Sequence, residues 1–284
     1  MPSVRRFDDP REFARFAEPF LMRDEARHNL ELGICRQLTG PEASRFGPEA
    51  PYLAVAESDD GVVGVAIRTP PFHVLITVAD PASHGAFADD LRRRFASLSG
   101  VTSDSVTAAA FAAAWHERTG DAVREGMPQR IYRLATPPDV PDVPGGFRAA
   151  TSADRDLLTR WIGEFNREAM PDAPHEDPAA IVDRRLADGS FFLWQQGEPV
   201  SFAGFGASTP NGIRVGPVYT PRGHRGHGYA SACVATLSRR LLDQGNRFLF
   251  LYTDLGNPAS NHVYLKMGYE PVCDMQELRF EPTS

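Results

Sequence analysis

The stretch Val215–Leu237, VGPVYTPRGHRGHGYASACVATL, decides the fold of the second half of the chain. An apolar strand pattern leads into a turn rich in glycine, histidine and arginine, and a helical pattern begins at Tyr229. A helix N-terminus presents unpaired backbone N–H groups and a partial positive charge, which together favour anions. The sequence therefore predicts a strand, a phosphate-binding turn and a helix, in that order.

Two familiar phosphate motifs match this turn incompletely. Gly223 and Gly228 have the spacing of a Walker loop, but the lysine and the Ser/Thr that should follow are missing. A Rossmann loop would use Gly226 and Gly228, but Ser231 stands where the third glycine should be. Asp254, at the end of the next strand, could mimic the ribose-binding acid, so a dinucleotide ligand stays open.

A third motif matches in full. The turn reads RGHGYA, which has the pattern [QR]-x-x-G-x-[GA], and it follows a strand ending in VYTP. Here the sequence resembles the GNAT superfamily of acetyl-CoA-dependent N-acetyltransferases. The resemblance implies a bulged strand that pairs with pantetheine through Val218, Tyr219 and Thr220. It also implies a loop that wraps the coenzyme A diphosphate, formed by Arg225, Gly226, His227, Gly228, Tyr229 and Ala230.

A second motif lies downstream, in DLGNPASNHVYLKMGY. It resembles the family pattern N-x-x-[AS]-x-x-x-Y-x-x-x-G-[FY]. Asn257 is a good N-cap and Pro258 suits the first helical position. The resemblance implies that Asn257 and Asn261 contact the coenzyme arm, and that Tyr264 binds near the sulfur and acts as the catalytic acid. A phenol of pKa about 10 can protonate a departing thiolate whose thiol has a pKa of about 8.5.

The general base is not visible in the sequence. The strand Ile213–Tyr219 contains no carboxylate. Asp254 is one candidate, although an acid just before a helix more often caps a turn, so the base stays unassigned. The eight histidines show no HxxxH or HxxEH spacing, and we expect no metal site.

The two halves of the chain resemble each other in outline. Each contains three strand patterns separated by turns and followed by a helix, which suggests a tandem duplication, with two unrelated meanders as the alternative. We expect a mixed α/β (α+β) fold of two GNAT-like domains, each with a mixed, mostly antiparallel sheet flanked by helices. The expected boundaries are a first domain at 1–136, a proline-rich linker at 137–146 and a catalytic domain at 147–284.

The first domain lacks the coenzyme loop. Asp80, Asp89 and Asp90 stand where the second copy has arginine and histidine, and acidic side chains would repel a diphosphate. We therefore expect a degenerate copy that either lines the acceptor site or only packs against its neighbour.

Composition restricts the remaining possibilities. Of 284 residues, 42% are hydrophobic and 24% charged, as in ordinary soluble proteins. A net charge of −7 argues against a nucleic-acid partner. Three cysteines without CxxC spacing favour a reducing compartment. No apolar run is long enough for a signal peptide or a membrane span. We expect a cytoplasmic protein and leave its oligomeric state open.

The resemblance implies transfer of an acetyl group from acetyl-CoA to a primary amine of a small molecule or peptide by direct attack. The main-chain N–H of Val218 would polarise the thioester carbonyl. Two alternatives stay open. One is a non-catalytic acyl-CoA sensor, in which Tyr264 is dispensable. The other is an aminoacyl-tRNA-dependent transferase, against which the net charge of −7 argues.

Overall fold

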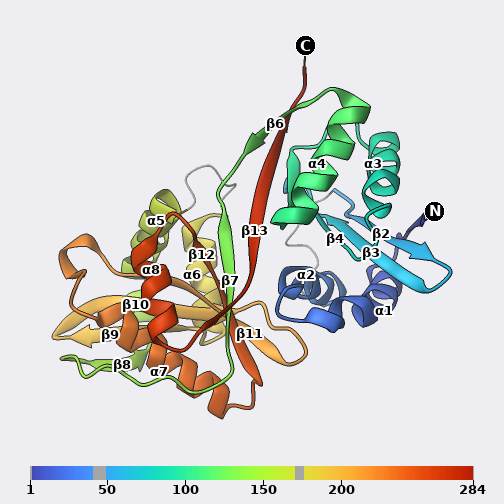
Figure 1. The fold of residues 1–284 in the computed structure, drawn as a ribbon. Coiled ribbons are helices and arrows are strands. Elements are labelled where there is room, and N and C mark those ends of the chain that lie inside the picture. Colours follow the sequence, from blue (N-terminus) through green and yellow to red (C-terminus); the bar gives the residue numbers. More distant parts are fainter. Residues whose placement is uncertain (1, 41–48, 170–175, 284) are drawn as a thin grey trace. The chain divides into compact units, whose positions relative to one another are not determined.

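A computed structural model describes residues 2–40, 49–169 and 176–283 (Figure 1). The chain forms two compact units. Unit 1 contains Met1–Ile131 together with Val272–Ser284, and unit 2 contains Tyr132–Pro271.

Unit 1 runs through strand, two helices, three strands, helix, strand and helix before its closing strands. Its elements are β1 (Ser3–Arg6), α1 (Pro10–Leu21), η1 (Met22–Asp24), α2 (Asn29–Thr39), β2 (Tyr52–Ser58), β3 (Gly61–Arg68), β4 (Val74–Val78), α3 (Ser83–Arg94), β5 (Gly100–Asp104), α4 (Ser105–Thr119), β6 (Ala122–Glu125), the start of β7 (Gln129–Leu134) and most of β13 (Glu270–Glu281).

The sheet of unit 1 has the order β1-β2-β3-β4-β5-β13, and β6 also pairs with β13. The β4–β5 pairing is parallel and the others are antiparallel. Alternate side chains of β2 enter two cores, as the two-residue period of a strand requires. Leu53 and Val55 pack with α1 and α2, whereas Ala54 and Ala56 pack with α3 and α4.

Unit 2 repeats the same order of elements. They are β8 (Gly146–Ala149), η3 (Ser152–Asp154), α5 (Arg155–Ala169), α6 (Pro178–Ala187), β9 (Phe191–Gln196), β10 (Glu198–Gly206), β11 (Gly212–Tyr219), η4 (Arg222–His224), α7 (Tyr229–Asp243), β12 (Phe248–Asp254) and α8 (Pro258–Lys266). The helical region after β8 begins with a capping box formed by Thr151 and Asp154.

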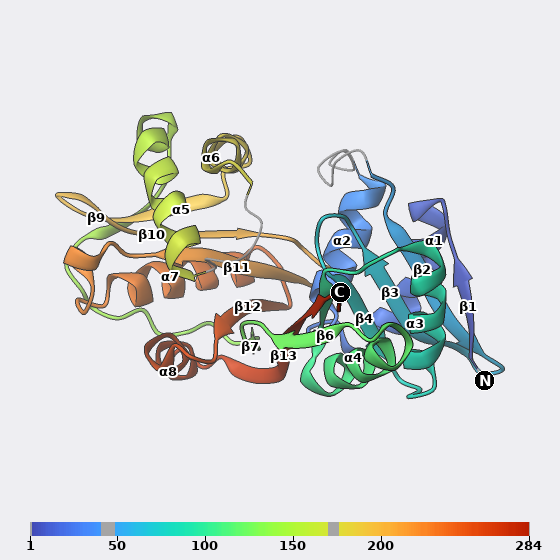
Figure 2. The ribbon, with the colours of Figure 1, turned by 90° about the horizontal axis from the view of Figure 1, so that it is seen from above.

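The strands of unit 2 have the order β8-β9-β10-β11-β12. The pairings from β8 to β11 are antiparallel, and β12 joins β11 in parallel. Figure 2 shows α5 and α6 on one side of these strands and α7 on the other. Phe191 and Leu193 pack under α5 and α6, whereas Phe192 and Trp194 pack under α7. The predicted mixed α/β class is confirmed.

The two units exchange short segments of chain. Tyr132 and Leu134, from the end of β7, are buried in the core of unit 2. Leu278 and Phe280, from β13, are buried in the core of unit 1, where β13 pairs with β5. The chain therefore does not divide at the expected boundary between 1–136 and 147–284, because each unit takes one strand segment from the other half of the sequence.

The proline-rich segment at 137–146 has no helix or strand before Gly146. It packs on unit 2, where Val140 and Val143 contact the core cluster beneath α7. The indole Nε1 of Trp194 donates to the Pro144 carbonyl at 2.9 Å. These contacts fix the segment against unit 2, so it does not act as a free spacer.

Candidate active site

The strand β11 carries a bulge and then separates from β12. Val218 pairs with Ala203 of β10 and Val215 pairs with Phe205, so two residues of β11 lie opposite one residue of β10. Among the described residues, the parallel pairing of β11 with β12 ends at Arg214. Both strands continue beyond that point, so the last residues of β11 can pair with an extended ligand on the side facing β12.

The turn after β11 leaves backbone donors unused. Gly226 and Gly228 have φ of +82° and +80°, the left-handed conformation that glycine adopts without strain. In the part of the chain that the structure describes, the N–H groups from Gly226 to Ser231 have no hydrogen-bond partner. They surround the N-terminus of α7, where the helix dipole also favours an anion.

The side chains of the turn are less free than its backbone. The His227 ring stacks on Tyr229, with centroids 5.5 Å apart, and the Tyr229 hydroxyl donates to Gln196. The Arg225 Nη2 donates to Glu168 of α5 at 2.6 Å, and its Nε donates to the Thr220 carbonyl at 2.8 Å. The positive charge of Arg225 is therefore already met by a carboxylate.

Tyr219 connects β11 to the same helix. Its hydroxyl donates to Glu164 at 2.9 Å and lies 3.4 Å from Glu168. Burial and the two carboxylates raise the pKa of Tyr219 to about 12. The hydrogen bond from Arg225 lowers the pKa of Glu168, so this glutamate stays ionised. The side chain of Tyr219 thus faces α5, while its backbone lies in the diverging part of β11.

The helix α8 carries the second motif. Asn257 caps it, with Oδ1 accepting from the Ser260 N–H at 3.1 Å. The Asn261 Nδ2 donates to the carbonyls of Asp254 and Asn257 at 2.9 and 2.8 Å. Both asparagines therefore fix the start of α8, directly after the diverging strand β12.

Tyr264 lies two turns along α8 and is half-buried. Its ring packs edge-on against Tyr269 at 5.6 Å and lies 6.4 Å from Tyr132. Burial raises the pKa of Tyr264 to about 12. Its hydroxyl has no partner within the ranges that the structure describes, so it can donate to a ligand. Tyr132, from the first half of the sequence, donates to Asn261 at 3.0 Å.

Asp254, the one candidate base from the sequence, has a structural task. Its Oδ1 accepts from the Gly256 N–H at 2.7 Å in the turn between β12 and α8. Three residues that were not predicted contact the predicted site residues, namely Glu164, Glu168 and Tyr132. The four-residue spacing of the two glutamates places them on one face of α5, but no local signal connects that face to β11.

The corresponding region of unit 1 is closed. The Asp80 side chain accepts from the Ala82 N–H at 2.9 Å, and its carbonyl accepts from the Ser83 N–H at 3.0 Å. The donors that lead into α3 are thus used internally. The pairing of β4 with β5 also ends early, but Ser103 of β5 donates its hydroxyl to the Ile76 carbonyl of β4.

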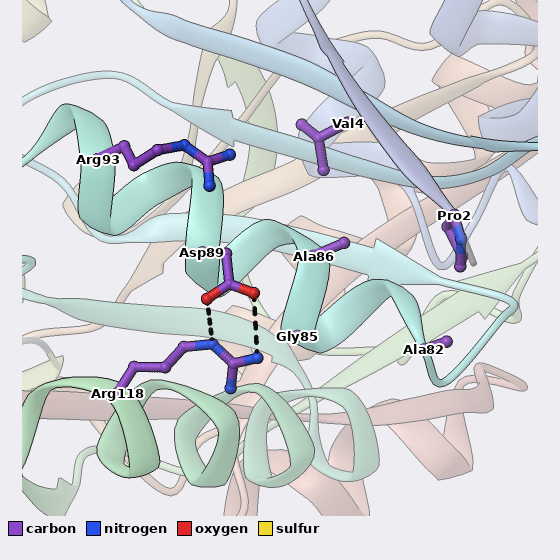
Figure 3. A pocket seen from close by; sticks show the side chains of 8 residues that line it. All are labelled: Pro2, Val4, Ala82, Gly85, Ala86, Asp89, Arg93 and Arg118. Atoms are coloured by element: carbon purple, nitrogen blue, oxygen red, sulfur yellow. Dashed lines mark hydrogen bonds and ion pairs between the residues drawn. The ribbon is translucent and has the colours of Figure 1, made fainter.

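A pocket of about 430 Å³ lies beside α3 in unit 1. Asp89 of α3 and Arg118 of α4 face each other in it (Figure 3). The guanidinium donates to both carboxylate oxygens, at 2.6 and 3.2 Å. Arg93 also lines the pocket and donates to Asp90 at 3.1 Å. Because both arginines are paired with acids, the pocket offers little free positive charge to a diphosphate.

The described part of the chain shows neither a metal-binding cluster nor a membrane-spanning helix. Within the described ranges, no group of three or more His, Cys, Asp or Glu side chains is arranged to hold a metal ion. None of the helices in the described part of the chain is long and apolar enough to span a bilayer.

Comparison with known families agrees with this geometry. Residues 154–269 match the model of the acetyltransferase (GNAT) family. The match lies within unit 2 and includes the bulged strand, the turn and α8. Unit 2 therefore carries a domain of the GNAT acetyltransferase family, as its two motifs indicated. No protein of curated function matches the chain.

Solved structures extend the likeness to both units. A Drosophila protein covers 100% of both chains with a TM-score of 0.68 at 13% identity. A tandem GNAT protein from the clavulanic acid biosynthesis pathway covers 100% of both chains with a TM-score of 0.60 at 14% identity. A GCN5-related N-acetyltransferase from Sphaerobacter thermophilus covers 100% of this chain and 96% of its own, with a TM-score of 0.60 at 15% identity. These likenesses show the fold, which is two GNAT-like units in tandem.

Proposed function

We propose that the protein transfers the acetyl group of acetyl-CoA to a primary amine of a small molecule or peptide. The observation that carries the proposal is the run of unpartnered N–H groups from Gly226 to Ser231 at the N-terminus of α7. A diphosphate is the ligand that this arrangement favours most. The neighbouring diverging strand supports a coenzyme with an extended arm.

The predicted site residues divide into three groups by task. The turn from Arg225 to Ala230 would hold the diphosphate, chiefly through its backbone. Val218, Tyr219 and Thr220 would pair with the pantetheine arm through their main chain. Asn257 and Asn261 fix the start of α8 and so set the position of Tyr264.

Acetyl-CoA would supply an activated thioester, which a neutral amine attacks directly. The main-chain N–H of Val218 would stabilise negative charge on the carbonyl oxygen. Tyr264 would give its phenolic proton to the departing sulfur. Burial raises the pKa of Tyr264 to about 12, so the phenol carries its proton at neutral pH and can hydrogen-bond to the sulfur as negative charge develops there. No side chain is assigned as the base for the amine.

Unit 1 keeps the fold without a coenzyme site in this proposal. The N-terminus of α3 is closed by Asp80, and Ser103 bridges the strands β4 and β5 where they separate. Both contacts would have to break before a diphosphate and its arm could bind there. We therefore assign one coenzyme to each chain.

The test is calorimetric titration of the full chain with coenzyme A, followed by thiol release from acetyl-CoA across a panel of amines and peptides. One bound coenzyme per chain and turnover with at least one amine are expected. Failure to bind coenzyme A would refute the proposal. Binding without turnover for any acceptor would instead favour an acyl-CoA sensor, and turnover only with charged tRNA would favour an aminoacyl transferase.

A further inference from the structure

We infer that Arg225 serves the coenzyme loop as a positioning residue that acts through Glu168 of α5, and that its guanidinium is not itself the diphosphate ligand. The inference rests on the proposed function, because it concerns how the same loop is held. It assigns to Glu168, a residue outside both sequence motifs, a part in coenzyme binding.

The Arg225 side chain holds the start of the loop against two neighbouring elements. The Arg225 Nε donates to the carbonyl of Thr220, the residue directly after β11, at 2.8 Å. Its Nη2 donates to Glu168 at 2.6 Å, and its guanidinium carbon lies 5.6 Å from the centre of the Tyr219 ring. One side chain therefore fixes the end of β11, the loop and α5 relative to one another.

Glu168 is a firm anchor for this tie. It lies in the last turns of α5, whose buried face is held in the core by Leu158, Trp161 and Ile162. The Tyr219 hydroxyl lies 3.4 Å from its second oxygen. The hydrogen bond from Arg225 lowers the pKa of Glu168 and keeps the carboxylate charged.

If the guanidinium of Arg225 bound the diphosphate directly, its hydrogen bond to Glu168 would have to break. The 2.6 Å contact between Arg225 and Glu168 is a short, charge-assisted hydrogen bond. The positive charge of the guanidinium is therefore already balanced by the carboxylate. The N–H groups from Gly226 to Ser231 have no such competitor. Arg222 is also more available, since its side chain is 82% exposed and its Nε lies 3.6 Å from Glu168.

The decisive variant is Glu168→Gln, because the two possible roles of Arg225 predict opposite changes in the affinity for coenzyme A. If Arg225 positions the loop through Glu168, coenzyme A should bind about three- to tenfold more weakly, the loss expected for one strong, partly exposed ion pair. If Arg225 binds the diphosphate directly, the substitution frees the guanidinium and removes a nearby negative charge, so coenzyme A should bind equally well or more tightly.

Glu198→Gln is the matched control. Glu198 also faces the loop, with Oε1 3.9 Å from the His224 Nε2, and its side chain is 74% exposed. The substitution makes the same change of charge beside the same loop without breaking the tie. Coenzyme affinity should be unchanged or slightly higher. Equal weakening in both variants would overturn the inference, because the loss of affinity would then not depend on the contact between Glu168 and Arg225.

A double-mutant cycle completes the test. Arg225→Gln and Glu168→Gln should each weaken coenzyme binding, and the double variant should be no weaker than the worse single variant, since both remove one tie. Fully additive losses would overturn the inference. The KM for acetyl-CoA should rise while kcat at saturation stays within about twofold. Thermal unfolding of each variant verifies the fold. A wild type that binds no coenzyme would instead refute the proposed function, and the inference with it.

Discussion

The surroundings of Tyr264 keep its phenolic hydroxyl protonated. Burial raises its pKa to about 12, and the ring is fixed between Tyr132 and Tyr269. Tyr264→Phe removes only the hydroxyl, so we expect coenzyme A to bind with unchanged affinity while kcat falls by about 10²-fold, the lower range for a general acid. Calorimetry and thiol release under saturating acetyl-CoA measure the two effects separately.

The ionisation of Tyr264 also predicts how the reaction rate depends on pH. Because the pKa of Tyr264 is raised to about 12, the phenol should not cause any loss of rate between pH 6 and about pH 10. Tyr269→Phe is the control for the loss of a tyrosine hydroxyl, since the Tyr269 hydroxyl lies 3.1 Å from the hydroxyl of Ser238. Full activity of Tyr264→Phe would contradict the assignment of the proton donor.

Glu31 is a buried acid with no role in the proposed reaction. It lies in α2, is 3% exposed, and its Oε2 has no hydrogen-bond partner among the described residues. Its pKa is raised above 4.5, chiefly by burial, while His28 acts in the opposite direction and Asp104 adds to the rise. The folded protein therefore holds a proton that the unfolded chain releases.

This proton makes stability depend on pH. The contribution of Glu31 is fully present below the unfolded pKa of about 4.5, and it is lost as pH rises through the raised folded pKa. Glu31→Gln cannot ionise, so its melting temperature should exceed that of the wild type by an amount that grows from pH 4.5 to pH 8. About 1 kcal/mol corresponds to a shift of roughly 2–4 °C. Parallel curves of melting temperature against pH would contradict this account.

Residues with local signatures were predictable and their tertiary partners were not. The glycine spacing of the loop and the cap at Asn257 are visible in the sequence because both obey rules that act within one turn. Glu168 lies 57 residues from Arg225 in sequence. No spacing rule connects them, because their contact depends on how α5 packs across β11.

At the scale of elements, the loop before α7 depends on its glycines to different degrees. Gly226 and Gly228 both have positive φ, but a Cβ on Gly226 would meet nothing within 4 Å, whereas one on Gly228 would lie 3.0 Å from the Val143 side chain. Alanine at either position is strained by about 1–2 kcal/mol. Coenzyme affinity should fall about 5- to 30-fold for Gly226→Ala and further for Gly228→Ala.

Gly223→Ala is the matched control for this pair. Gly223 does not have positive φ, and a Cβ there meets nothing within 4 Å, so coenzyme affinity should not change. Titration of the three variants with coenzyme A ranks them directly. If Gly223→Ala were as harmful as Gly228→Ala, simple crowding of the ligand would explain the losses better than backbone strain.

Most elements of unit 2 could be placed from the sequence because their amphipathic patterns are clear. The helical pattern predicted to begin at Tyr229 forms α7, Tyr229–Asp243, and the helix predicted from the cap at Asn257 forms α8, Pro258–Lys266. The unit in which the last strand, β13, packs could not be predicted in the same way. The alternating apolar residues of β13 indicate a strand with one buried face, but not which unit covers that face.

At the scale of the whole molecule, the two similar units differ in the hydrogen bonding of their equivalent turns. Both have a pair of strands that separate after a short parallel pairing. In unit 2 the adjoining turn leaves its N–H groups unused, whereas in unit 1 Asp80 and Ser103 satisfy the equivalent donors and carbonyls. An unused backbone donor is costly unless water or a ligand satisfies it, so the difference indicates which unit is kept open for a ligand.

The strand segments that the two units exchange determine which fragments of the chain should fold. Two fragments divide the second half differently, since 132–271 keeps Tyr132 and Leu134 in the core of unit 2, whereas 147–284 omits them and retains β13. Loss of two large buried side chains costs about 2–5 kcal/mol each, which rivals the whole stability of a domain. The fragment 132–271 should therefore unfold cooperatively on heating and bind coenzyme A, while 147–284 should be aggregated or show no cooperative transition. Circular dichroism and calorimetry compare the two, with the full chain as reference. If 147–284 folded as well as 132–271, the exchanged segments would contribute little, and the boundary expected from the sequence would be the better division of the chain.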